Sequence, residues 1–266
     1  MVDRADIPET SRFAALRPPQ RAALALWAVL SAVAVGAGAL LVTLGGAPAA
    51  AGYAALVTLA ACALGGWVIL RGLGSGAYPH DRLGLCNAVT MARGAGIAVL
   101  AGLAVAPQAL TGSDGFGWAV VALAAGVLAL DGLDGWLARR SGLHSRFGAR
   151  FDVESDVVFA VVMAVLAWQA DKVGAWFLLI GGLRPAFLLA GAVWRALRAP
   201  LPDARWRKVM AGVQMGVQVA LLAPLLAPPL SHAVGAAILI AIMTCFAVDI
   251  RWLLRRHSQP AALREG

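Results

Sequence analysis

Charged residues are scarce in this sequence. Asp, Glu, Lys and Arg together make up 14% of its 266 residues, whereas 61% are hydrophobic and the mean hydropathy is +0.78. A soluble domain carries about a quarter charged residues, because charged groups must cover its surface. The composition therefore excludes an ordinary soluble globular domain and indicates a protein embedded in a membrane.

Cysteine is also rare, and its placement does not resemble a ligand pattern. Cys62, Cys86 and Cys245 show no paired spacing. Each lies in or beside an apolar stretch, where a free cysteine behaves as a small hydrophobic residue. We therefore interpret all three as packing residues rather than as nucleophiles or metal ligands.

Apolar stretches long enough to cross a bilayer recur along the whole chain. A hydrocarbon core of roughly 30 Å requires about 20 mostly apolar residues in a helix. We place about eight such stretches at Ala23–Gly45, Ala50–Leu70, Asn87–Ala106, Phe116–Ala138, Val153–Ala170, Val173–Trp194, Val209–Leu226 and Ser231–Ile250. The sequence thus predicts an all-α fold, a polytopic membrane bundle of about eight transmembrane helices.

The basic residues alternate along these stretches. The chain has 22 Lys and Arg against 14 Asp and Glu, a net charge of +8. The basic residues gather before the first stretch and after every second one, while the other connections carry almost no charge. This positive-inside pattern predicts an integral protein of the cell (inner) membrane with both termini in the cytoplasm. It also accounts for the net charge without nucleic acid, because basic loops meet the anionic headgroups of membrane lipids.

A glycine-rich segment divides the chain. Gly72, Gly74 and Gly76 precede Pro79, and these residues end helices. We predict an N-terminal part at residues 1–78 with two additional transmembrane helices, a six-helix core at 79–257 and a C-terminal tail at 258–266. The predicted basic loops of the core lie on the cytoplasmic side, so a soluble substrate would be handled at that face.

Four aspartates lie where the fourth and fifth stretches meet. Asp131 and Asp134 are three residues apart on one helix, and Asp152 and Asp156 are four apart on the next. Each pair therefore shares one face of its helix. Because a short connection makes the two helices antiparallel neighbours, the two acidic faces can oppose each other.

Clustered carboxylates at membrane depth need compensation. One Asp at the centre of a membrane helix costs roughly 2.5–3.5 kcal/mol, and four neighbouring anions also repel one another. Hard divalent cations such as Mg²⁺ prefer carboxylate oxygens and bridge them to substrate phosphates. We therefore predict one or two divalent ions here. They would draw charge from a phosphoryl group while a remaining carboxylate takes a proton from an attacking hydroxyl.

The spacing of these residues resembles the signature of the CDP-alcohol phosphatidyltransferase (CDP-alcohol phosphotransferase) family. The order Asp131-x2-Asp134-Gly135-x2-Ala138-Arg139-x8-Gly148-x3-Asp152-x3-Asp156 matches every fixed position of that pattern. The resemblance covers about residues 83–256, and the first two helices look like an addition. It implies an enzyme of phospholipid biosynthesis that transfers a phosphatidyl group from a CDP-linked lipid, such as CDP-diacylglycerol, to an alcohol and releases CMP.

The resemblance also implies roles for individual residues. Two ions, Mg²⁺ or Mn²⁺, would be held by Asp131, Asp134, Asp152 and Asp156. Asp156 would also be the general base that activates the acceptor hydroxyl. The nucleotide would be bound by Asn87, Thr90 and Arg93, an Asn-x2-Thr-x2-Arg segment, and by Gly135, Ala138, Arg139 and Gly148. The resemblance further suggests a homodimer.

The acceptor site is predicted from basic residues of the later stretches. Arg184 lies within the sixth apolar stretch, where a cation is expensive and a functional role is expected. Lys208 and Gln214 partly resemble a Gly-Lys-x-x-Thr-x-x-Gln segment of phosphatidylglycerophosphate- and cardiolipin-synthase-like members. We predict that Arg184, with Arg150 or Lys208, binds a phosphate of the acceptor, because a dianion near four aspartates needs fixed cations of its own.

Two other classes of membrane protein use acidic residues in a similar way. A Mg²⁺-dependent membrane prenyltransferase is compatible with the spacing of Asp152 and Asp156, but that chemistry does not explain the Ala-Arg-x8-Gly spacing. A divalent-cation transporter would line a route across the bilayer with acids. The aspartates here cluster near one face instead, so the pattern favours the transferase.

Overall fold

The computed structural model describes residues 18–74, 83–141, 146–199, 201–202 and 204–258. These residues form α1 (Pro18–Leu44), α2 (Ala51–Gly74), α3 (Leu85–Leu103), α4 (Pro107–Gly112), α5 (Asp114–Ser141), α6 (Arg146–Gln169), α7 (Leu179–Val193), α8 (Arg205–Leu221) and α9 (Leu230–Ser258), with short 3₁₀ helices η1 (Pro48–Ala50), η2 (Ala175–Leu178) and η3 (Arg195–Arg198). Every predicted apolar stretch is mostly helical, and the described residues contain no strand. The predicted all-α membrane bundle is confirmed.

The number of helices suited to cross a membrane differs from the prediction. Among the described residues, six segments are long and apolar enough: Pro18–Leu44, Pro48–Gly72, Leu85–Leu103, Asp114–Gly135, Ala175–Val193 and Leu230–Arg256. The other two predicted spans lie in α6 and α8. Helix α6 carries Asp152, Glu154 and Asp156 in its first half, and α8 has only 17 residues. Acidic residues thus set α6 apart from the six segments, and shortness sets α8 apart, so the eight-span topology stays a prediction.

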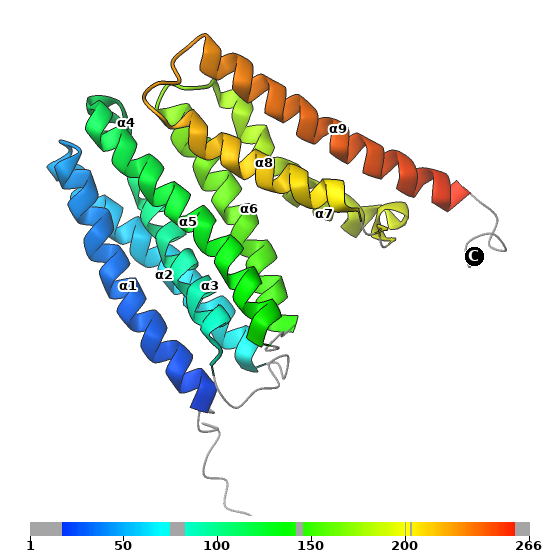
Figure 1. The fold of residues 1–266 in the computed structure, drawn as a ribbon, viewed down its shortest axis with the longest axis horizontal. Coiled ribbons are helices and arrows are strands. Elements are labelled where there is room, and N and C mark those ends of the chain that lie inside the picture. Colours follow the sequence, from blue (N-terminus) through cyan, green and yellow to red (C-terminus); the bar gives the residue numbers. More distant parts are fainter. Residues whose placement is uncertain (1–17, 75–82, 142–145, 200, 203, 259–266) are drawn as a thin grey trace, which may run out of the picture.

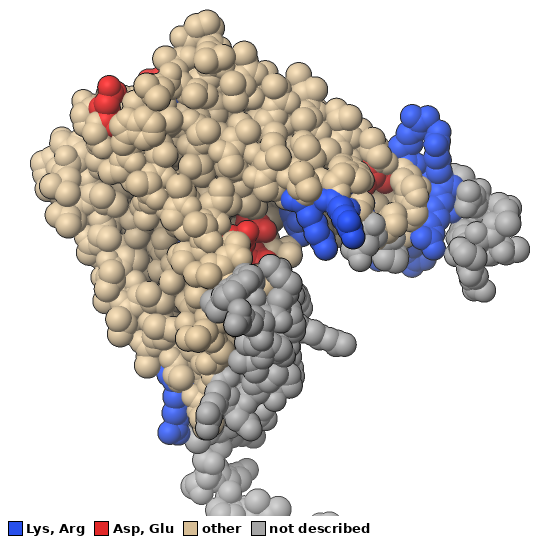
Figure 2. Space-filling model, in the orientation of Figure 1, with Lys and Arg blue, Asp and Glu red and all other residues tan. Residues whose placement is uncertain are grey.

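The helices form two groups that meet at an angle (Figure 1). Helices α1, α2, α3, α5 and α6 run alongside one another, and α7, α8 and α9 extend to the side of them. The larger apolar core lies where the groups join and includes Leu100 of α3, Phe159 of α6 and Phe177 of η2. The angle between the groups leaves a concave side on the molecule, visible in Figure 2.

Connections that carry little charge gather at one end of the bundle. Gly45, after α1, packs against Ala109 of α4. Gly117 of α5 packs against Pro224, which follows α8. Lys172, after α6, donates hydrogen bonds to the carbonyl oxygens of Pro224 and Leu226 at 3.5 and 2.9 Å. The α1–α2, α3–α5, α6–α7 and α8–α9 connections therefore lie at one end of the bundle. The charge alternation predicts this, because it places these four connections on the same side of the membrane.

The N-terminal helix pair packs directly on α3. The indole Nε1 of Trp27 in α1 donates to the Cys62 carbonyl oxygen of α2 at 2.9 Å. The Trp27 ring also lies against Gly65 of α2 and Gly94 of α3, where a built Cβ would lie 2.6 and 3.4 Å from it. Small residues at helix contacts let backbones approach closely, which is a main source of helix association within lipid. Helices α1 and α2 are therefore joined tightly to the helix that begins the core.

This contact predicts a loss of stability on truncation. Trp27 is 6% exposed, so Trp27→Ala removes a packed ring from the junction of three helices and should cost about 3–5 kcal/mol. The matched control is Trp67→Ala, because Trp67 on α2 is 49% exposed and lies over Arg71 on the bundle surface. Thermal unfolding in detergent measures both. Equal losses for the two variants would contradict the packing role of Trp27.

Candidate active site

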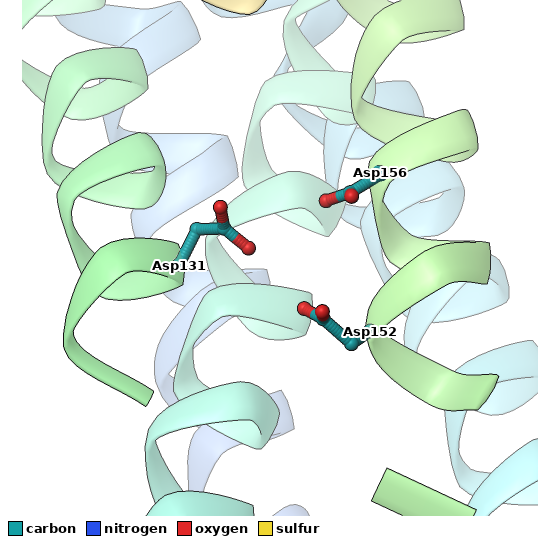
Figure 3. A group of neighbouring side chains, drawn as sticks. All are labelled: Asp131, Asp152 and Asp156. Carbon is teal, nitrogen blue, oxygen red and sulfur yellow. The ribbon is translucent and has the colours of Figure 1, made fainter. Parts of the chain in front are cut away.

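The aspartates predicted from the sequence come from the facing ends of α5 and α6. Carboxylate oxygens of Asp131, Asp152 and Asp156 all lie within 4.8 Å of one another. Figure 3 shows Asp131 pointing from α5 toward the other two side chains, which project from α6. The predicted opposition of the two acidic faces is therefore present in the fold.

Asp134 occupies a different position from the other three. Its side chain is buried, and its Oδ2 atom lies 2.9 Å from Thr90 Oγ1 of α3. The same hydroxyl oxygen lies 2.9 Å from the Cys86 carbonyl oxygen, so one hydroxyl proton serves two acceptors. Thr90 thus joins α3 to the acidic end of α5, and the conformation of Asp134 depends on α3.

The guanidinium of Arg93 lies among the remaining carboxylates. Its Nη1 atom is 2.8 Å from Asp131 Oδ1 and 2.6 Å from Asp152 Oδ1, and its Nη2 atom pairs with Asp156. The Arg93 side chain is only 1% exposed. A buried cation is costly unless it is paired and hydrogen-bonded. Its planar fork of donors meets that requirement by contacting carboxylates from both helices.

The carboxylates themselves are accessible from outside the bundle. The side chains of Asp131, Asp152 and Asp156 are 30, 40 and 29% exposed. Figure 2 shows acidic side chains on the concave side of the molecule, with Lys and Arg side chains beside them. A ligand entering there would meet anionic groups that suit a metal and cationic groups that suit a phosphate.

Other residues predicted for the nucleotide lie around this cluster. Asn87 is buried on the first turn of α3, three residues before Thr90, so the two share a helix face. Gly135 is half-buried directly after Asp134. The remaining predicted positions lie in helix ends whose side chains are outside the described residues: Ala138, Arg139, Gly148 and Arg150.

Of the predicted acceptor residues, Arg184 is the better placed. It is exposed on α7 and close enough to Asp156 to act on that carboxylate electrostatically. Gly181 explains the approach, because a Cβ there would lie 2.8 Å from the Cα of Val161 in α6. The close contact fixes α7 against α6 one turn before Arg184. Lys208 is exposed near the start of α8.

A polar contact between α8 and α6 was missed by the sequence prediction. Gln218 is fully buried, and its Nε2 donates to the Ala160 carbonyl oxygen at 2.8 Å. Its Oε1 accepts from Gln214 Nε2 at 3.4 Å. Ala160 lies one turn after Asp156, so these glutamines hold α8 beside the site. The signal was a second glutamine inside an apolar stretch, four residues after Gln214 on the same face.

The donor set fits a divalent cation. Three carboxylates from two helices converge within 4.8 Å, and carboxylate oxygens are the ligands that Mg²⁺ and Mn²⁺ prefer. Asp134 is the adjacent fourth carboxylate on the same helix face as Asp131. The partial exposure of the three clustered side chains leaves them reachable by a metal–phosphate ligand.

Fold and site together define a polytopic membrane protein with an acidic, metal-compatible centre at the ends of two neighbouring helices. The family model for CDP-alcohol phosphatidyltransferase matches residues 83–248, more than half of the chain. The chain therefore belongs to the CDP-alcohol phosphatidyltransferase family. It is a transferase that moves a phosphate-linked group from a CDP-alcohol donor to an alcohol acceptor in a membrane, and the family uses divalent metal.

The matched region contains the whole site. It begins two residues before α3 and ends within α9, and it includes Arg93, the aspartates and Arg184. Helices α1 and α2 lie outside it. No curated protein and no solved structure matches the chain.

Proposed function

We propose that this protein transfers a phosphatidyl group from CDP-diacylglycerol to an alcohol in phospholipid biosynthesis. The acceptor oxygen forms a bond to the lipid-linked phosphorus, the bond from that phosphorus to the CMP oxygen breaks, and CMP leaves. The observation that carries the proposal is the convergence of Asp131, Asp152 and Asp156 within 4.8 Å, with partly exposed side chains, in a membrane bundle. A diphosphate-linked lipid can reach such a site with its tails in the bilayer.

The proposed metal ligands are Asp131, Asp134, Asp152 and Asp156. Four carboxylates would suit two divalent ions, Mg²⁺ or Mn²⁺. When bound there, the metal would supply positive charge that stabilises the phosphoryl oxygens and the leaving CMP. Asn87, Thr90 and Gly135 lie at the same ends of α3 and α5, which supports placing the cytidine nucleotide there.

Asp156 is the proposed general base. Arg184 of α7 interacts electrostatically with Asp156, more weakly than Arg93 does. An acceptor phosphate bound by Arg184 would bring its hydroxyl group to the α6 side of the cluster, within reach of Asp156. That arrangement gives the two residues separate tasks, with Arg184 orienting the acceptor and Asp156 taking its proton.

Binding of Arg184 to an acceptor phosphate predicts a selective effect on one substrate. Arg184→Lys keeps the charge but loses the two-pronged match to phosphate oxygens. We expect the KM for a phosphorylated acceptor such as glycerol 3-phosphate to rise about tenfold, a loss of about 1.4 kcal/mol, with little change in the KM for CDP-diacylglycerol. Arg255→Lys, an exposed cation at the far end of α9, is the control. An enzyme that uses serine or choline and ignores phosphorylated acceptors would refute this assignment and leave the reaction class intact.

We further propose that the site faces the cytoplasm. Its entrance lies at the end of the bundle opposite the weakly charged connections, where the basic residues gather. Reporter fusions at Pro48, Asp114 and Ser231 should therefore read external, and fusions at Gly74 and Ser141 cytoplasmic. A cytoplasmic reading at Asp114 would place the aspartate cluster on the external side of the membrane and exclude this topology.

Ligand protection distinguishes the proposed donor from a prenyl diphosphate. CDP and CDP-diacylglycerol should raise the unfolding temperature of the purified protein in the presence of Mg²⁺, because ligands that bind the native state stabilise it. Geranylgeranyl diphosphate should produce no comparable shift at the same concentration. Stabilisation by the prenyl diphosphate alone would favour a prenyltransferase.

A further inference from the structure

We propose that Arg93 is a built-in counter-ion of the acidic cluster and sets how tightly that cluster binds a divalent cation. The proposal rests on the proposed function in one respect, namely that the cluster binds metal. It gives Arg93 a role different from the nucleotide contact that the family resemblance implies. In this role Arg93 is a positioning residue, because it acts through the aspartates.

The contacts of Arg93 are already used within the protein. Its two terminal nitrogens contact Asp131, Asp152 and Asp156, carboxylates that come from two different helices. Its side chain is 1% exposed, whereas each of the three carboxylates is at least 29% exposed. A ligand approaching from the concave side therefore meets the carboxylates first, with the guanidinium behind them.

The backbone that carries Arg93 is held in place. Its neighbour Gly94 lies against the rings of Trp27 and Phe151, at 3.4 and 3.7 Å from a built Cβ. Trp27 belongs to α1 and Phe151 directly precedes Asp152 on α6. Packing of α1 and α6 against Gly94 therefore holds the α3 backbone next to Arg93, and the ion pairs with the three carboxylates hold the guanidinium itself. Its positive charge therefore acts on the cluster without a substrate.

The consequence is electrostatic. Four ionised aspartates carry a formal charge of −4, and Arg93 reduces this to −3. A divalent ion held by the same carboxylates is repelled by the guanidinium, because both cations compete for the same oxygens. Arg93 therefore stabilises the folded cluster in the absence of metal and weakens its affinity for metal. A weak resident affinity favours ions that arrive with the diphosphate of the substrate.

Metal titration of charge variants tests this role. The variants are Arg93→Met, which removes the charge, Arg93→Lys, which keeps it, and Arg207→Met. The last breaks an ion pair with Asp249 at 2.8 Å between α8 and α9, and serves as the matched control. Mn²⁺ binding is followed by electron paramagnetic resonance, and thermal unfolding is recorded in chelator and in Mg²⁺. Neither readout depends on turnover.

Arg93→Met should bind Mn²⁺ at least about tenfold more tightly than wild type, because the substitution removes a nearby positive charge that repels the divalent ion. It should unfold at a lower temperature in chelator and regain stability in Mg²⁺. Arg93→Lys should keep its Mn²⁺ affinity within about threefold of wild type, because the charge remains. Arg207→Met should lose stability equally with and without metal.

Unchanged or weaker Mn²⁺ binding by Arg93→Met would overturn the counter-ion role. If that variant cannot be purified in chelator, it is purified in Mg²⁺, where the divalent ion should replace the lost charge. Failure to recover it in Mg²⁺ also overturns the proposal. Wild-type protein that binds no Mn²⁺, alone or with CDP, would instead refute the metal centre of the proposed function.

Discussion

Removal of divalent cations is expected to abolish CMP release from CDP-diacylglycerol. Without metal, the clustered carboxylates would repel the phosphoryl oxygens of the donor, and Arg93 is already paired with those carboxylates. Activity should return when Mg²⁺ or Mn²⁺ is added in excess of the chelator. Full CMP release in excess chelator would contradict the metal centre.

Substitution of one proposed ligand tests whether the metal requirement comes from the acidic cluster. Asp152→Asn keeps the shape of the side chain but removes one negative charge, so metal affinity and activity should fall together. Glu154→Gln is the matched control, because Glu154 is an exposed acid two residues away on the same helix and outside the cluster. If both variants lost activity alike, general surface charge rather than the cluster would be responsible.

Replacement of Asp156 by Asn should have the second large effect. A general base contributes about 10²–10⁴-fold, equivalent to about 3–5.5 kcal/mol of barrier. The amide oxygen can still accept a hydrogen bond from Arg93, so the fold of the site should survive. Turnover should therefore fall by that factor while the affinity for CDP-diacylglycerol changes little.

Steady-state kinetics at saturating Mg²⁺ measures the effect of Asp156→Asn on turnover, again with Glu154→Gln as the control. The decisive comparison is between kcat and the binding of donor and metal. If Asp156→Asn lost metal and nucleotide binding but kept normal turnover at saturation, Asp156 would be a ligand only, and the base would have to be sought elsewhere.

The arrangement of the aspartates was predictable because it depends on local geometry. Spacings of three and four residues put each pair on one helix face, and α5 and α6 both pack against α3, which brings the two acidic faces together. Apolar length likewise predicted the long helices. Six of the eight predicted spans lie in described helices that are long and apolar enough to cross a membrane, and the crossings by α6 and α8 stay predictions.

The position of Arg93 could not be derived in this way. It is 59 residues from Asp152 in the sequence, and the contact depends on how α3 docks against α5 and α6. That docking depends on close packing at small residues such as Gly94, which periodicity does not specify. The separation of Asp134 from the other three aspartates has the same origin, since Thr90 of α3 binds it.

Product analysis with a panel of alcohols tests the central claim most directly. Purified protein is incubated with CDP-diacylglycerol, Mg²⁺ and one alcohol at a time, including glycerol 3-phosphate, phosphatidylglycerol, inositol phosphate, serine and choline, and CMP and lipid product are measured together. The proposed function predicts equal amounts of CMP and a new phospholipid with at least one acceptor, most strongly with a phosphorylated one, and neither product with Asp156→Asn beyond about 1% of wild type. Absence of CMP and of a new lipid with every acceptor, in protein that binds Mn²⁺, would contradict it.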